Sequence, residues 1–296
     1  MVTPAYQIGV DGGGTKTELI LVDAAGTVVA RHTAPGCNPS HVGSEMARVI
    51  LTEALENLRN GHTIRRTMLF MAGSPAFWHE TAAVLTNYGE ISTAPDSVPV
   101  VELATRGAAG LVLHAGTGSF VAARSADGVI HYAGGLGWKI GDPGSAFDLG
   151  RRGIAHALLE LQNWAPHTPL SAALQAHIGL PDAIGITRYL YNEVAANAVI
   201  AGFAPRVIAL AAQACAPAQA ALAATLGEMV AQARLVTENL FPGSQPVPCG
   251  VSGAILNSPP AVATLRALAG AQTWNVEYHF LTEPPIEGVR RLLLGR

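Results

Sequence analysis

The sequence contains few charged residues and few cysteines. Asp, Glu, Lys and Arg make up 13% of its 296 residues, and 21 acidic against 18 basic side chains leave a formal net charge of −3. No basic run is long enough to form an arm, so the composition does not indicate a nucleic-acid partner. The three cysteines lie far apart and form no CxxC pair. This spacing argues against a zinc site and favours a reducing, cytoplasmic compartment.

The sequence also lacks an uninterrupted apolar segment of membrane-spanning length. Its most apolar stretch, residues 207–233, is interrupted by three glutamines, a glutamate and Pro217. We therefore predict a buried helix pair broken at Pro217, and no membrane partner. Residues 1–4 lead into a strand-like segment without a charged and apolar leader, so we expect no signal peptide. Hydrophobic residues make up 49% of the chain, enough for a sizeable core.

The order of apolar segments predicts an α/β protein in which one pattern occurs twice. The first copy has strands over 6–10, 17–22 and 27–32, a helix over 39–59, a strand over 67–72, a helix over 75–87 and a strand over 90–94. The second has strands over 111–115, 120–124 and 129–133, a mostly helical region over 145–240, a strand over 247–251, a helix over 259–269, a strand over 274–280 and a helix over 286–294.

A glycine-rich loop joins the first two predicted strands. Residues 11–17 read Asp-Gly-Gly-Gly-Thr-Lys-Thr. A Walker A loop needs Gly-Lys-Ser/Thr, but Thr15 separates Gly14 from Lys16, and a dinucleotide fingerprint needs a third glycine where Thr17 stands. Both of those motifs also lie between a strand and a helix, whereas this loop lies within a predicted hairpin. The sequence thus excludes both common nucleotide motifs here.

The second copy repeats this loop as Gly116-Thr117-Gly118-Ser119. The spacing from Gly14 to Gly116 is 116 − 14 = 102, and the spacing from Gly26 to Gly128 is 128 − 26 = 102. We interpret this as an internal duplication of a β-hairpin unit. The alternative is that two unrelated hairpins share turn residues.

Two such turns suit a nucleotide held from two sides. Glycines leave backbone N–H groups free to approach phosphate oxygens, and the hydroxyls of Thr15, Thr17, Thr117 and Ser119 add further contacts. Asp11 is then expected to hold Mg²⁺, through water because Mg²⁺ dehydrates reluctantly. The alternative is that Asp11 only caps a turn.

The motifs together resemble a known family. Residues 11–17 look like the first phosphate motif, and residues 116–119 like the second, of the superfamily that joins sugar kinases, actin and the heat-shock chaperones. Residues 134–145, Gly-Gly-Leu-Gly-Trp-Lys-Ile-Gly-Asp-Pro-Gly-Ser, are close to a signature of the N-acetylglucosamine kinase branch of the BadF/BadG-type ATPase family. Residues 248–253 resemble the adenosine motif, and residues 284–288 the closing turn. The matches run in order from residue 9 to about residue 289.

The resemblance implies two actin-like (ribonuclease H-like) domains, each with a βββαβα core, around a nucleotide cleft. We expect an N-terminal domain over 1–109 and a C-terminal domain over 110–296, with a hinge near 106–110. The possibility that the last helix packs back on the N-terminal domain is left open. The resemblance further implies ATP and Mg²⁺ as cofactors and a homodimer as the assembly.

The resemblance also implies roles for particular residues. ATP and its phosphates would be bound by Gly12, Gly13, Gly14, Thr15, Lys16, Gly116, Thr117, Gly118, Gly250, Ser252 and Gly253, and Mg²⁺ by Asp11. The sugar would be bound by Asn38, whose amide grips a hydroxyl, by the carboxylate of Asp142, and by Gly135, Leu136 and Gly137. The family signature usually has Trp at Leu136 and Glu at Pro143, and both departures bear on sugar preference.

In this family the catalytic base is an aspartate at the end of the last N-terminal-domain strand, about twenty residues before the second phosphate turn. Asp96 fits that place, since 116 − 96 = 20. It would take the proton of the sugar's primary hydroxyl, although positioning and charge neutralisation do most of the work in phosphoryl transfer. Glu102 is the rival acid, and Asp96 as a simple turn residue is the other alternative.

Three functions follow from these residues. The favoured one is an ATP-dependent amino-sugar kinase that phosphorylates the primary (6-) hydroxyl of N-acetylglucosamine or a close analogue, with a glucosamine kinase as a variant. The second is a non-kinase ATPase of the reductase-activator type. Its iron–sulfur cluster needs cysteines after the second phosphate motif, and none lies between Cys37 and Cys215. The third is a binding-only scaffold, which the intact Asp11, Thr117 and Asp142 argue against.

Overall fold

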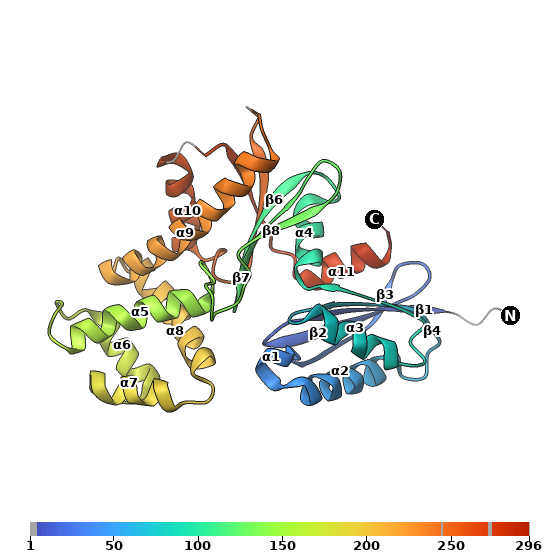
Figure 1. The fold of residues 1–296 in the computed structure, drawn as a ribbon, viewed down its shortest axis with the longest axis horizontal. Helices are drawn as coiled ribbons and strands as arrows, with labels where there is room; N and C mark the ends of the chain where they lie inside the picture. Colours follow the sequence, from blue (N-terminus) through green and yellow to red (C-terminus); the bar gives the residue numbers. More distant parts are fainter. Residues whose placement is uncertain (1–4, 244, 272–273, 296) are drawn as a thin grey trace. The chain divides into compact units, whose positions relative to one another are not determined.

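The computed structural model describes residues 5–243, 245–271 and 274–295, and the chain divides into two compact units. The first contains the described residues up to Gly107 together with those from Thr282 onward, and the second contains those from Ala108 to Leu281. Each unit holds a mixed sheet of five strands (Figure 1). The predicted α/β class with a repeated βββαβα core is thereby confirmed. Residues 1–4, on which the expectation about a signal peptide rests, lie outside the described residues.

The sheet of the first unit has the order β3-β2-β1-β4-β5. β1, β2 and β3 pair antiparallel, while β4 and β5 run parallel to β1. The elements of this unit are β1 (Tyr6–Gly12), β2 (Lys16–Val22), β3 (Val28–Pro35), α1 (Pro39–Val42), α2 (Ser44–Arg59), β4 (Ile64–Met71), α3 (Pro75–Val84), β5 (Glu90–Pro95), α4 (Ser97–Thr105) and α11 (Pro285–Leu293).

Helices cover both faces of this sheet (Figure 1). Ile8 and Val10 of β1 pack on one face in a core shared with α2, which contributes Leu51, Leu55 and other residues at helical spacing. On the other face α11 brings Ile286, Val289 and Leu293 against Ile20 and Phe70. Gly9 lies between Ile8 and Val10, and a Cβ on it would lie 2.4 Å from Val289 Cγ1. A glycine is therefore required for α11 to lie this close to β1.

The second unit repeats the arrangement with the sheet order β10-β9-β6-β7-β8. Five helices lie between β8 and β9 in the chain, which accounts for the mostly helical region predicted there. The elements are β6 (Gly110–Ala115), β7 (Ser119–Arg124), β8 (Ile130–Ala133), α5 (Ala146–Leu161), α6 (Pro169–Ile178), α7 (Ala183–Asn192), α8 (Ala196–Ala212), α9 (Ala216–Leu240), β9 (Val247–Ser252), α10 (Pro259–Ala271) and β10 (Val276–Phe280).

One large apolar core holds the second unit together. Leu111, Leu113 and Val251 from the sheet pack with Phe203 of α8 and Val230 of α9, and all five are fully buried. Within the described residues, no single helix has both the length and the hydropathy needed to cross a membrane; only α8 and α9 together, with a bend of 116° between them, meet those two criteria.

Three local predictions were wrong in detail. The helix predicted over 39–59 is two helices, because Gly43 adopts φ +84° between them. The helix predicted over 75–87 ends at Val84, and Asn87 has a left-handed backbone. The break in the apolar helix pair falls at residues 213–215, so Pro217 lies in the first turn of α9, where a proline costs no hydrogen bond. A second proline, Pro205, lies inside α8.

Candidate functional site

The first glycine loop closes the β1–β2 hairpin of the first unit. Gly13 N–H donates to Lys16 O (2.9 Å), and Gly36 N–H donates to Thr15 O (3.1 Å). The loop therefore touches the turn that follows β3, and a Cβ on Gly36 would lie 2.3 Å from Gly14 O. The hairpin context predicted from the sequence is confirmed.

Two carboxylates lie at the same edge of this sheet. Gly12, Met71 and Pro95 occupy one row across β1, β4 and β5, so Asp11 is the next-to-last residue of β1 and Asp96 directly follows β5. Burial, followed by the charges of Asp96 and Glu18, raises the pKa of Asp11 to about 7, against a smaller opposite effect of Lys16. Burial raises the pKa of Asp96 to about 6, against hydrogen bonds from its own backbone N–H and that of Ser97.

A divalent cation would reduce the repulsion between the carboxylates at this edge. Asp11 lies opposite Glu18 in the β1–β2 ladder, and Lys16 Nζ lies 2.5 Å from Glu18 Oε2 on the same strand. The described residues contain no group of three or more His, Cys, Asp or Glu side chains that could enclose a metal ion. Mg²⁺ is usually held by one or two carboxylates with water and phosphate oxygens, so Asp11 and its surroundings fit this ion.

Asn38 begins the short helix α1 beside the loop. Its Oδ1 accepts a hydrogen bond from Ser40 N–H (3.0 Å), which leaves the Nδ2 amide as the group that can donate to a ligand. Gly73 has φ +98°, and a Cβ on it would lie 2.8 Å from Asn38 Oδ1. His41 also approaches the loop, because its ring would contact a Cβ on Gly14 at 3.0 Å. No role for His41 was predicted from the sequence.

The second glycine loop closes the β6–β7 hairpin of the second unit. Gly116 N–H donates to Gly118 O (2.9 Å), and Ala146 N–H at the start of α5 donates to Gly116 O (2.9 Å). Asp142 lies against this loop, since its Oδ2 accepts a hydrogen bond from Ser119 N–H (3.3 Å). Its Oδ1 is buried and has no hydrogen-bond partner among the residues that the structure describes. Burial raises the pKa of Asp142 to about 6, and Asp148 adds to this effect while hydrogen bonds from Ser119 and Gly137 oppose it.

The loops of the two hairpins differ in length by one residue. In the first, Gly12 pairs with Thr17, and in the second Ala115 pairs with Ser119. Residues after the two loops are therefore 102 positions apart in the sequence, whereas residues before the loops are 103 apart. With the offset of 103, the residue equivalent to Asp11 is His114 and not Leu113. His114 stacks on Phe120, and burial lowers its pKa to about 4, so the imidazole is neutral at physiological pH.

The proposed adenosine segment lies where β9 meets β6. Gly253 has φ +97°, and a Cβ on it would lie 2.1 Å from Ala115 O. Ser252 pairs with His114 at the same end of the sheet. Gly250, in contrast, lies buried inside β9 between Val112 and His279, so its own contacts are with neighbouring strands.

The segment over 134–144 is rich in left-handed glycines. Gly134, Gly135, Gly137, Gly141 and Gly144 all have positive φ, which explains their density in the signature. Leu136 is 67% exposed, and Gly135 packs on Phe120. Leu136 and Gly137 thus lie on an open part of the loop, whereas Asp142 at its end is buried.

A family model for BadF/BadG/BcrA/BcrD ATPases matches residues 8–288 of the chain. The chain belongs to this family. The match includes both glycine loops, the 134–145 segment and the adenosine segment, and it confirms the family assigned from those motifs. The ATP-binding expectation is consistent with membership of an ATPase family.

Two relatives found by sequence comparison are named as sugar kinases. The chain is 27% identical over 207 residues to "N-acetyl-D-glucosamine kinase" of Dictyostelium discoideum, with 62% of the chain and 64% of that protein covered. It is 24% identical over 198 residues to "N-acetylmuramic acid/N-acetylglucosamine kinase" of Clostridium acetobutylicum, with 64% and 65% covered. The chain therefore matches slightly less than two thirds of the length of each of these relatives.

Solved structures share the fold over nearly the whole chain. A protein of Chromobacterium violaceum described as a candidate N-acetylglucosamine kinase superposes with a TM-score of 0.77 at 24% identity, covering 98% of this chain and 99% of that one. At this identity the likeness concerns the fold. It matches the two five-stranded sheets described above.

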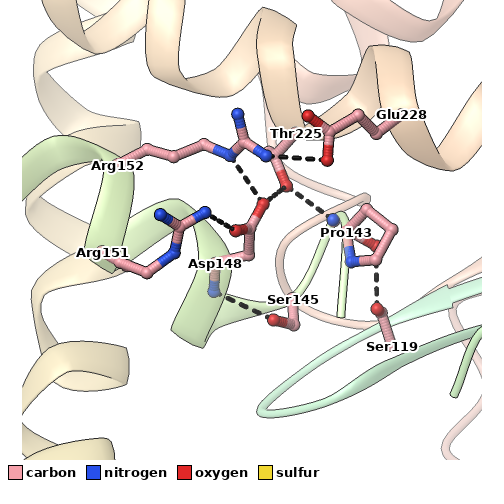
Figure 2. A network of polar contacts seen from close by, with 9 residues as sticks. Ser119, Pro143, Ser145, Asp148, Arg151, Arg152, Thr225 and Glu228 are labelled. Atoms are coloured by element: carbon pink, nitrogen blue, oxygen red, sulfur yellow. Dashed lines mark hydrogen bonds and ion pairs between the residues drawn. The ribbon is translucent and has the colours of Figure 1, made fainter. Parts of the chain in front are cut away.

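The polar cluster beneath the 142–145 segment was not predicted from the sequence (Figure 2). Asp148 accepts hydrogen bonds there from Arg151, Arg152 and Thr225. The local sequence pattern that could have indicated it was Ser145-x-x-Asp148, which is typical of a helix N-terminus. Thr225 lies on α9, far along the chain, and no local pattern marked it.

Proposed function

We propose that this family member is an ATP-dependent amino-sugar kinase that phosphorylates the primary (6-) hydroxyl of N-acetylglucosamine or a close analogue. The observation that carries the proposal is the Asp11–Asp96 pair beside the first glycine loop. One carboxylate suits a metal-bound polyphosphate, and the other, with a pKa of about 6, is suited to accepting a proton near neutral pH. The names of the Dictyostelium and Clostridium relatives support an amino sugar as the acceptor.

The proposed mechanism assigns each residue a limited task. ATP with Mg²⁺ supplies the phosphoryl group and neutralises its charge. Asp11 would hold the ion through water, while Gly12, Gly13 and Gly14 would present backbone N–H groups to phosphate oxygens. Thr15 and Lys16 lie at the same loop and complete that half of the phosphate site.

The second unit is proposed to bind the nucleotide through two further segments. Gly116, Thr117 and Gly118 present the second loop, and the 250–253 segment contacts the adenosine. Gly253 can approach a ligand closely because it carries no side chain.

The sugar is proposed to be held by Asn38 and Asp142. The Nδ2 amide of Asn38 donates to one hydroxyl, and the unpartnered Oδ1 of Asp142 accepts from another. Gly135, Leu136 and Gly137 line the same sugar. Asp96 then accepts the proton of the primary hydroxyl as its oxygen bonds to the γ-phosphorus. The P–O bond to ADP breaks in the same step, so ADP leaves with the electron pair.

A coupled assay of ADP release over a panel of sugars tests the proposal. We expect turnover only with Mg²⁺ and an amino sugar, and product analysis should place the phosphate on the primary hydroxyl. The panel should contain N-acetylglucosamine, N-acetylmuramic acid, glucosamine, N-acetylmannosamine and glucose. Preference for glucosamine would select the glucosamine kinase variant. ADP release that is equal with and without every sugar would contradict the kinase and favour the non-kinase ATPase.

We also propose that the protein works in the cytoplasm as a homodimer. Support for the compartment comes from its three cysteines, all free and buried. The dimer rests on the family resemblance. Sedimentation at several protein concentrations would test the dimer, and a monomer throughout would contradict it.

A further inference from the structure

A compact cluster of charged and hydroxyl side chains lies under the turn that carries Asp142. We call it the Asp148 cluster, and Figure 2 shows how its members face one another. Arg151 Nη2 donates to Asp148 Oδ1 (2.6 Å), Arg152 Nε donates to Asp148 Oδ2 (2.7 Å), and Arg152 Nη2 donates to Glu228 Oε2 (2.7 Å). Two positive and two negative charges balance, so the cluster has no evident need for an added ion.

Thr225 links this cluster to the backbone of the turn. Its Oγ1 accepts from Gly144 N–H (2.6 Å) and lies 2.6 Å from Asp148 Oδ2. A hydroxyl has one proton, and Oγ1 accepts from the amide, so that proton is donated to Asp148. Hydrogen bonds from Thr225, Arg152 and Arg151 hold the pKa of Asp148 below its usual range despite its burial. Asp148 is therefore an ionised acceptor, and the hydrogen bonds have one direction.

The same turn is held on its other side by the second glycine loop. Ser119 Oγ donates to Pro143 O (2.8 Å), and Ser119 N–H donates to Asp142 Oδ2 (3.3 Å). Ser145 N–H donates to Asp142 O (3.0 Å), and Ser145 Oγ accepts from Asp148 N–H (3.0 Å). Every residue from Asp142 to Ser145 is buried and fixed by at least one hydrogen bond.

Helix α9 provides the surface on which Gly144 lies. A Cβ on Gly144 would lie 2.9 Å from Met229 Sδ, and Gly144 has φ +90°. Met229 follows Thr225 by one helical turn, so the two side chains share a face of α9. Met229 fixes how closely the turn approaches, while the Thr225 hydroxyl fixes its position along the helix.

We propose that Thr225 is a positioning residue for Asp142. Its hydroxyl accepts from Gly144 N–H and donates to Asp148, which Arg151 and Arg152 hold in place, and this anchor keeps Oδ1 of Asp142 in position to receive a hydroxyl. The part that concerns a sugar hydroxyl rests on the function proposed above. The anchoring of the turn does not.

Thr225→Val is the direct test because valine nearly preserves the shape and removes the hydroxyl. It leaves Gly144 N–H buried without an acceptor and removes one donor from Asp148. Thr225→Ser keeps the hydroxyl and should restore the wild-type behaviour. Thr264→Val is the matched control, because the Thr264 hydroxyl donates only to Pro260 O within its own helix, α10 (2.8 Å).

Hydrogen exchange read by mass spectrometry tests the anchoring without any substrate. In Thr225→Val, a peptide covering residues 134–147 should exchange at least about tenfold faster than in the wild type, because a lost buried hydrogen bond loosens the turn. Thr225→Ser and Thr264→Val should exchange there as the wild type does. Unchanged exchange in a folded Thr225→Val protein would overturn the proposal.

Steady-state kinetics tests the consequence for the sugar. Thr225→Val should raise the sugar KM about tenfold or more and change the KM for ATP by less than about twofold, with rescue by serine. An equal rise in the KM values for sugar and ATP, or a fall in kcat alone, would overturn the assignment to Asp142. A wild-type protein that phosphorylates no sugar would refute the proposed function, while the exchange experiment would still decide the anchoring.

If Thr225→Val does not fold, Glu228→Gln provides a milder change. The Glu228 side chain is 58% exposed and holds Arg152 from the solvent side. The same peptide should then exchange about twofold faster, and unchanged exchange would overturn the proposal.

Discussion

Asp11 lowers the stability of the protein at neutral pH, so Asp11→Asn should raise its free energy of unfolding. The pKa of Asp11 is raised from 3.8 to about 7. Each pKa unit corresponds to about 1.36 kcal/mol, so a shift of about 3 units sets a ceiling of about 4 kcal/mol. Because Asp11 is only partly buried, solvent screening lowers the destabilisation below this ceiling. We expect Asp11→Asn to raise the free energy of unfolding by about 2 kcal/mol.

The pH dependence of this effect of Asp11 on stability follows from proton binding in the folded and unfolded states. Below pH 3.8 Asp11 is protonated in both states and costs nothing. Between pH 3.8 and about 7 the unfolded chain has lost this proton while the folded protein keeps it, so stability falls as pH rises. Above about pH 7 the cost is constant. The gain from Asp11→Asn should therefore be largest above pH 7 and fall to roughly a quarter of that value at pH 4.5.

Urea unfolding between pH 4.5 and 8, in EDTA and without nucleotide, measures this gain. Trp78 is buried in the first unit, the unit that contains Asp11, and its fluorescence should report the relevant transition. Glu53→Gln on the exposed side of α2 is the control, because it removes a carboxylate without changing the site. A gain that is absent at pH 8, or equal at pH 4.5 and 8, would refute the electrostatic reasoning.

Adding Mg²⁺ and a non-hydrolysable ATP analogue should reverse the order of stability. A ligand that binds only the folded state stabilises it by about 2.7 kcal/mol at a hundred times its Kd. The wild type should gain this stabilisation and Asp11→Asn should lose most of it. Equal stabilisation of both proteins would show that Asp11 has no part in holding the ion.

The remaining predictions concern Asp96 and two glycines. Asp96→Asn should lower kcat by about two orders of magnitude or more while calorimetry still detects sugar binding, and near-normal turnover would remove Asp96 from the role of base. Gly253→Ala should destabilise the second unit by at least about 2 kcal/mol in urea unfolding, because a Cβ would meet Ala115 O at 2.1 Å in a left-handed backbone. Gly227→Ala in α9 is the counterpart. Apart from its chain neighbours and the backbone of its own helix, no atom of the described residues lies within 4 Å of its Cβ position. The substitution should therefore stabilise by about 0.5–1 kcal/mol, and destabilisation would contradict the assignment of open space.

Features encoded by adjacent residues could be predicted from the sequence. The loop at 11–17 and its echo at 116–119 lie in hairpins as expected, because alternating apolar residues and turn glycines specify a hairpin locally. Asp96 was placed at a strand end by counting, and the register that brings it to the edge near Asp11 follows from the parallel pairing of β4 and β5. The roles given to these residues stay predictions.

Features that depend on distant residues could not be predicted. Thr225 and Asp148 are 77 positions apart, and their contact depends on how α5 and α9 pack. Helix α4 was missed because its nine residues are apolar on nearly every side and show no helical periodicity. The Asp11–Glu18 pairing, in contrast, was within reach, since cross-strand neighbours follow once a hairpin register is fixed.

The last helix, α11, has a consequence for how the protein is made. It completes the first unit, yet it is synthesised after the whole of the second. At roughly 5–20 residues per second, a ribosome needs roughly 10 to 35 s to add residues 108–281. During that time one apolar face of the first sheet, with Ile20 and Phe70, lacks its native cover. Apolar surface that stays exposed during synthesis favours aggregation, so the first unit is the part of the nascent chain at greater risk, while the continuous second unit can fold without waiting for α11.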